Sequence, residues 1–111
     1  MKLHEQKHGA VTVIRPEGPL VEEHAQTLKT NLLSAMSGSL GRVVVDLSAV
    51  PFVDSRGLET LVDLTEEMAK SGQALKLCAP NKTVREVLEL TALVSMFDHF
   101  DDLNSAVRSF L

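Results

Sequence analysis

The chain has 111 residues, of which 44% are hydrophobic and 23% are charged, and its formal net charge is −4. This length and composition are typical of one globular domain, so we expect a single domain spanning residues 1–111. The acidic balance disfavours a nucleic-acid-binding protein, which usually presents a basic face. No apolar run is long enough to cross a bilayer, and residues 1–8 lack the apolar segment of a signal peptide. We therefore expect a cytoplasmic protein without membrane insertion.

The first third of the chain predicts a β-hairpin followed by a helix. Residues 3–7 and 10–15 are expected to form two short strands joined around His8-Gly9. Residues 15–19, Arg-Pro-Glu-Gly-Pro, are expected to end the second strand, because proline cannot donate to a strand ladder. A helix from about residue 21 is predicted by apolar side chains at helical spacing, which are Ala25, Leu28, Leu32 and Met36.

The middle of the chain predicts a buried strand and a second amphipathic helix. Three consecutive valines, residues 43–45, form an apolar run that is typical of a strand covered on both faces. A helix is expected to start after Asp54-Ser55 and to end at Ser71-Gly72. Its predicted buried stripe consists of Leu58, Leu61, Val62, Thr65, Met68 and Ala69.

The last third of the chain predicts two more strands and two more helices. The expected strands are residues 75–78 and 96–100. A third helix is expected after its cap Asn81, and a final helix is expected to start at Asp101 or Asp102 and to run to Leu111. The order ββαβαβαβα favours an α/β fold with a mixed, partly parallel sheet of about five strands and packed helices. The predicted inner face of the third helix carries Val84, Val87, Leu88 and Thr91.

Ser55 is the first candidate for a functional residue. It follows an apolar strand and a short loop, and it stands where a helix is expected to begin. A hydroxyl at that point is held toward solvent at the positive end of a helix dipole, which favours an added phosphate. Serine is also a favoured helix N-cap, so the position supports a cap as well as a phosphorylation site, and the two roles are compatible.

Other residue patterns in the sequence lack the neighbouring residues that their chemistry would require. Asp46 ends a valine-rich strand, but the chain has no Gly-x-x-x-x-Gly-Lys-Ser/Thr loop, so we interpret Asp46 as an acceptor of local backbone hydrogen bonds. A phospho-aspartate receiver requires an acidic pair after its first strand and a lysine after its last strand. Residues 15–17 do not supply the pair, and residues 100–102 do not supply the lysine. The four histidines are scattered, and the lone Cys78 is expected to be a core residue. We expect no metal and no cofactor.

Residues 52–58, Phe-Val-Asp-Ser-Arg-Gly-Leu, together resemble the signature loop of STAS domains. These domains occur in bacterial anti-sigma factor antagonists and in anion transporters. The resemblance covers most of the chain, because Gly18-Pro19-Leu20 falls where the family turns into its first helix and residues 43–48, 72–77 and 87–93 match later elements. It implies the STAS mixed sheet with helices packed against it.

The resemblance also implies a protein-binding module that is not an enzyme. In the antagonist branch, the unphosphorylated protein binds an anti-sigma factor and so frees a sigma factor for transcription. That anti-sigma factor is also a serine kinase, which phosphorylates the serine after the signature aspartate, here Ser55, and the complex dissociates until a phosphatase restores the binding form. A phosphate adds about −1.5 to −2 charges, and next to Asp54 inside an interface it brings repulsion and a desolvation cost.

Two positions depart from the family's pattern. Arg56 stands where antagonists usually carry Ser or Thr, and it could pair with Asp54, contact a partner, clamp a phosphate or remain a solvated residue of the first helical turn. Val21 stands where many switchable antagonists carry an aspartate, which either of the two following glutamates could replace in space. Both departures favour the alternative role of a STAS accessory subunit in a membrane transport ATPase, such as a lipid-type ABC transporter, whose serine is not phosphorylated.

The partner is expected to dock on the signature loop and on the helix that follows it. The expected partners are an anti-sigma factor that is a serine kinase and a phosphatase. Val107, Phe110 and Leu111 either pack on the core or serve a dimer, so we expect a monomer or a weak dimer. The candidate contact residues are Asp54, Ser55, Arg56, Gly57, Leu58, Glu59, Val62 and Asp63.

Overall fold

The computed structural model describes residues 1–111 and contains one five-stranded sheet in the order β1-β2-β3-β4-β5. β1 and β2 pair antiparallel, and all other neighbours pair in parallel. The expected fold class and element order are therefore confirmed. The strands are β1 (Lys2–His8), β2 (Val11–Glu17), β3 (Val43–Asp46), β4 (Lys76–Cys78) and β5 (Asp98–Phe100), and the helices are α1 (Glu22–Gly38), α2 (Ser55–Ala69), α3 (Lys82–Leu90) and α4 (Leu103–Arg108), with a 3-10 turn at Val94–Met96.

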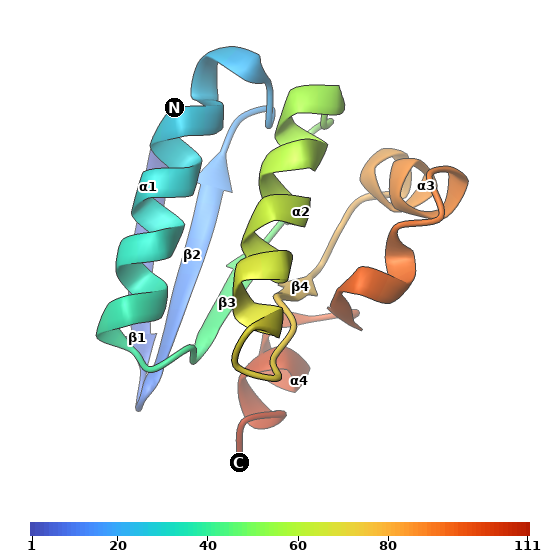
Figure 1. The fold of residues 1–111 in the computed structure, drawn as a ribbon. Coiled ribbons are helices and arrows are strands. Elements are labelled where there is room, and N and C mark those ends of the chain that lie inside the picture. The colour runs from blue at the N-terminus through green and yellow to red at the C-terminus, as the bar shows by residue number, and fades with distance from the viewer.

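The helices form layers on both faces of the sheet. α1 and α2 lie side by side on one face, with their first turns at the same end, whereas α4 lies against the other face (Figure 1). α3 lies to the side, beyond β4 (Figure 1). None of the helices combines the length and the apolar character that a bilayer crossing requires.

The strand β3 lies at the centre of the sheet and is buried on both faces. Val43 and Val45 belong to the larger core under α1 and α2, whereas Val44 belongs to a smaller core under α4. All three valines are fully buried, as their continuous apolar run predicts. Cys78 lies in the smaller core, where burial raises the pKa of its thiol to about 12, so the thiol stays protonated at neutral pH.

Two predicted details near the first two helices are wrong. β2 continues through Pro16, because β2 pairs with β3 only as far as Ile14, and the missing N–H of Pro16 lies beyond that pairing. In α2, Ala69 is exposed and Leu64 is fully buried, since the helix packs against α1 as well as against the sheet.

The boundaries near the C-terminus also differ from the prediction. Residues 94–96 form the 3-10 turn, so β5 begins only at Asp98. Thr91 is exposed at the end of α3, where its hydroxyl donates to the Val87 carbonyl (2.7 Å). Helix α4 follows the predicted cap Asp102 but ends at Arg108, which leaves Leu111 98% exposed. Val107 and Phe110 pack on the smaller core.

Thr65 joins α2 to the segments that precede the last two strands. Its side chain is buried, and its hydroxyl accepts from the Leu75 N–H (3.0 Å) and donates to the Met96 carbonyl (2.8 Å). Leu75 directly precedes β4, and Met96 lies two residues before β5. One hydroxyl therefore satisfies two backbone groups that the sheet ladder leaves free.

Replacing Thr65 by valine should lower the free energy of unfolding by about 2–4 kcal/mol, because valine keeps the shape but leaves a buried amide and a carbonyl without partners. Thr60→Val is the matched control. Thr60 is also buried, but its hydroxyl donates only to the Arg56 carbonyl of its own helix, so the expected loss is below about 1 kcal/mol. Urea unfolding measures both values, and equal losses would contradict the bridging role of Thr65.

Candidate functional site

The loop that leads into the candidate site, residues 47–54, is fixed by a parallel backbone pairing with residues 18–20. The Leu20 N–H donates to the Phe52 carbonyl (3.1 Å), and the Leu20 carbonyl accepts from the Asp54 N–H (3.0 Å). The Leu20 side chain is fully buried in the larger core. The segment between β2 and α1 thus holds the segment between β3 and α2 in place.

Asp54 caps α2, so the interpretation of Ser55 as the N-cap is wrong by one residue. One oxygen of the Asp54 carboxylate accepts from the Gly57 N–H (2.8 Å), and the other accepts from the Glu22 N–H (3.2 Å). Val21, the N-cap residue of α1, offers no capping side chain. Asp54 therefore satisfies an amide in the first turn of each helix.

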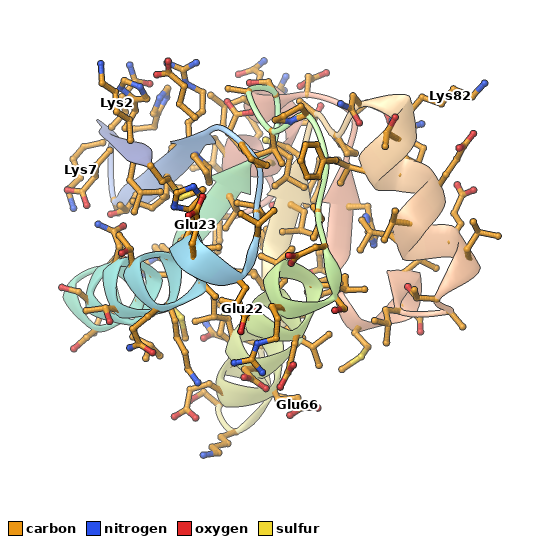
Figure 2. All side chains as sticks on the ribbon, turned by 90° about the horizontal axis from the view of Figure 1, so that it is seen from above. Lys2, Lys7, Glu22, Glu23, Glu66 and Lys82 are labelled. Carbon is orange, nitrogen blue, oxygen red and sulfur yellow. The ribbon has the colours of Figure 1, made fainter.

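The same contacts keep Asp54 negatively charged. The hydrogen bond from the Gly57 N–H is the main reason that the pKa of Asp54 lies below its ordinary value of 3.8, and the bond from the Glu22 N–H adds to it. The positive ends of two helix dipoles thus meet at one carboxylate. Figure 2, which looks onto these helix ends, shows Glu22 and Glu23 at the start of α1, with Glu22 beside the first turn of α2.

Ser55 is the first residue of α2 and is exposed. Its hydroxyl has no hydrogen-bond partner within the chain, so the oxygen is available to an incoming group. It stands directly after Asp54, at the end of the molecule where α1 and α2 both begin (Figure 1). An anion attached here would meet the N-terminal dipoles of two helices and, at the same time, the carboxylates of Asp54 and Glu22.

Arg56 does not pair with Asp54. Its guanidinium lies 3.3 Å from the Glu59 carboxylate, one helical turn further along α2, and both side chains are more than half exposed. An exposed pair of this kind contributes little to stability, so Arg56 is free to exchange Glu59 for another anion.

The other candidate contact residues divide into exposed and buried positions. Glu59 is exposed, Val62 and Asp63 are half-buried, and the Asp63 carboxylate lies 3.5 Å from the Lys29 ammonium of α1. Leu58 is only 8% exposed and belongs to the larger core, and Gly57 is buried as well. Gly57 and Leu58 therefore position the loop and the helix, and they offer a partner little surface.

Gly57 is buried because α2 begins in direct contact with the backbone of Leu20. A Cβ atom added at Gly57 would lie 2.0 Å from the Leu20 carbonyl oxygen, which no side chain can accommodate without a backbone shift. The close approach of the two segments therefore requires glycine at this position.

The remaining candidate groups do not form a second site. The Asp46 carboxylate accepts from the Ser48 N–H (3.0 Å), which confirms its interpretation as a local acceptor. No three histidine, cysteine, aspartate or glutamate side chains come together in a way that would hold a metal ion.

Comparison with known proteins gives a consistent set of relatives. A family model described as the STAS domain matches residues 2–106. BtrV of Bordetella bronchiseptica, named as a candidate anti-sigma factor antagonist, is 26% identical over 110 residues, which cover 99% of this chain and 95% of BtrV.

Solved structures show the same fold. The crystal structure of a candidate anti-sigma factor antagonist from Thermotoga maritima superposes with a TM-score of 0.88 at 24% identity and covers 96% of this chain and 92% of that one. The antagonist SpoIIAA superposes in its unphosphorylated form with a TM-score of 0.75 at 18% identity, over 97% of this chain and 96% of that one. Its phosphorylated form, from Bacillus, gives a TM-score of 0.70 at 17% identity, over 97% and 99%.

Replacing Gly57 by alanine should lower the free energy of unfolding by about 2 kcal/mol or more, because the added methyl group pushes α2 away from the Leu20 carbonyl. Gly38→Ala is the matched control, since Gly38 is the last residue of α1 and an added Cβ there meets nothing within 4 Å. That substitution should be neutral or stabilise by up to about 1 kcal/mol. Urea unfolding compares the two, and a neutral Gly57→Ala would contradict the close approach.

Proposed function

The chain belongs to the STAS domain family, and on that premise we propose that residues 1–111 act as one STAS domain, an anti-sigma factor antagonist that works by reversible binding without catalysis. Its partner would be an anti-sigma factor that is also a serine kinase, in the cytoplasm of a bacterium, and a phosphatase would reverse the modification. The names of the sequence relative and of the similar structures support this role over that of an accessory subunit in a transport ATPase.

The observation that carries the proposal is the exposed hydroxyl of Ser55, which has no hydrogen-bond partner within the chain and directly follows a loop whose backbone is fixed. A kinase must reach the acceptor oxygen, and Ser55 presents it at the end of the molecule where α1 and α2 begin. SpoIIAA has been solved in a phosphorylated and in an unphosphorylated form, which supports a phosphorylated state of the same fold.

The geometry around Ser55 suits a switch that leaves the fold intact. In the free chain, a phosphate on Ser55 would remain in water and would meet the N-terminal dipoles of α1 and α2. In a complex it would have to leave water while standing next to the ionised Asp54 and near Glu22. The phosphate therefore weakens binding much more than it weakens folding.

The proposed contact surface combines the signature loop with the exposed side of α2. The loop end of this surface consists of Asp54, Ser55 and Arg56. Further along the helix it consists of Glu59, Val62 and Asp63. Arg56 is available to a partner because its pair with Glu59 is exposed. Gly57 and Leu58 support this surface from beneath.

Substitutions at Ser55 should separate binding from phosphorylation. Ser55→Ala is expected to bind the anti-sigma factor as tightly as the wild type and to accept no phosphoryl group from ATP, whereas Ser55→Asp should weaken binding about tenfold or more through a second charge beside Asp54. Calorimetry gives the Kd, and intact mass gives the modification.

Ser105→Asp is the control for a new acid after a capping aspartate. Ser105 is exposed in the first turn of α4, on the opposite face of the sheet, and the Asp102 carboxylate accepts from its N–H (2.7 Å). This variant should bind normally. Full affinity of Ser55→Asp, or a phosphoryl group on Ser55→Ala, would contradict the proposed switch.

Reversing the charge of the α2 surface should also weaken binding. The double variant Glu59→Lys with Asp63→Lys is expected to raise the Kd at least about tenfold, because it reverses the potential that faces the partner. A double variant at the two sheet edges, Glu5→Lys with Asp98→Lys, makes the same change in net charge away from α2 and should bind nearly as well as the wild type. Equal Kd values for both double variants would show that α2 does not face the partner.

A further inference from the structure

Phe52 is a half-exposed aromatic residue three positions before Ser55. The chain has four phenylalanines and neither Trp nor Tyr. Phe97 is buried in the larger core, and the rings of Phe100 and Phe110 lie 5.5 and 4.1 Å from the Lys76 ammonium. Phe52, in contrast, keeps 48% of its surface exposed. Three of the four rings thus have a clear structural role, and Phe52 presents its ring to solvent.

The backbone on both sides of Phe52 is fixed. The Asn81 side-chain amide donates to the Val50 carbonyl (3.2 Å) and to the Pro51 carbonyl (3.1 Å), while its oxygen accepts from the Val84 N–H and caps α3. The Phe52 carbonyl itself accepts from Leu20. The backbone at Phe52 cannot move away without breaking these bonds, so the point from which its side chain extends is preorganised for contact.

The other strongly exposed apolar residues stand in different surroundings. Leu40 lies in the turn after α1, Leu90 is the last residue of α3, and Leu111 ends the chain. Single exposed apolar residues are common on protein surfaces and need no partner. Phe52 differs because it combines an exposed ring, a fixed backbone and a position beside the proposed phosphorylation site.

Charged groups flank this loop unequally. The view onto the helix ends in Figure 2 shows Glu22 and Glu23 on the α1 side, while Lys82 lies on the outer side of α3. Asn81, which holds the Phe52 loop, directly precedes Lys82. The loop that carries Phe52 therefore lies between an acidic border at the start of α1 and the start of α3, where the Lys82 ammonium pairs with Glu86 (3.9 Å). A complementary partner has an apolar pocket for the ring and basic groups on the side that faces α1.

We propose that Phe52 is the apolar anchor of the partner interface, and that this interface extends from the first turn of α1, across the signature loop, to the start of α3. The proposal takes the identity of the partner, an anti-sigma factor, from the proposed function. Buried aromatic anchors carry a large share of the binding energy in many interfaces. A phosphate on Ser55 would stand beside such an anchor, in the part of the interface from which water must be excluded.

The test compares Phe52→Ala with Leu90→Ala, which removes another exposed apolar side chain at the far end of α3. Binding to the purified anti-sigma factor is measured by calorimetry without ATP. Phe52→Ala should raise the Kd about tenfold or more, and Leu90→Ala should change it less than about twofold. Phe52→Leu, which keeps an apolar side chain, should recover part of the affinity. Urea unfolding of each variant reports whether the loop still folds, and Phe52→Lys repeats the test if truncation destabilises the chain.

A second readout separates this proposal from the phosphorylation switch. In the kinase reaction, Phe52→Ala should raise the KM for the antagonist while kcat stays close to that of the wild type, because the ring contributes binding and does not touch the transferred group. A normal Kd for folded Phe52→Ala would overturn the anchor. A raised Kd for Phe52→Ala together with full affinity of Ser55→Asp would support the anchor and refute the switch. No binding by the wild type would refute both.

Discussion

The candidate site depends on the Asp54 carboxylate, which accepts one hydrogen bond from the first turn of α2 and one from the first turn of α1. The backbone pairing of Leu20 with the loop brings the two segments close enough for this double contact, and Gly57 leaves room for it. This arrangement fixes the first turns of the two helices relative to each other and places Ser55 directly after a held loop. A side chain that caps two helices also makes up for Val21, which cannot cap its own helix.

The same arrangement explains how a small chemical change could control binding. Helix N-termini favour an anion, so a phosphate on Ser55 need not unfold the chain. The surrounding carboxylates and the exposed ring of Phe52 make the same place unfavourable for a phosphate that is removed from water. Under the proposed function, the free chain would tolerate modification and the complex would not. The backbone around the loop is held by hydrogen bonds, so a local rearrangement cannot make the phosphate acceptable in the complex.

Much of the fold could be predicted from the sequence, because periodic apolar patterns and Gly, Pro and Asn signals are local. The three valines of β3, the Asn81 cap and the helix after Asp54-Ser55 are examples. The contacts that build the site are not local. Asp54 and Glu22 are 32 residues apart, and only the folded chain shows that Asp54 caps α1 as well as α2. The burial of Leu64 likewise depends on how α2 packs against α1, whereas helical spacing alone predicted the burial of Leu58. The importance of Phe52 depends on its exposure, which no sequence pattern reports. A glycine in the first turn of a helix, such as Gly57, is a local sign of a close backbone approach, but only the folded chain identifies Leu20 as the neighbour.

The most direct measurement is mass spectrometry of the protein isolated from its own host, with the fraction bound to an anti-sigma factor analysed separately from the free fraction. If phosphorylation of Ser55 is the switch, we expect no phosphoryl group in the bound fraction and one phosphoryl group, on Ser55, in part of the free fraction. A bound fraction that carries phosphorylated Ser55 would contradict it, and so would a protein whose Ser55 is unmodified in both fractions and whose bound partner is a transport ATPase.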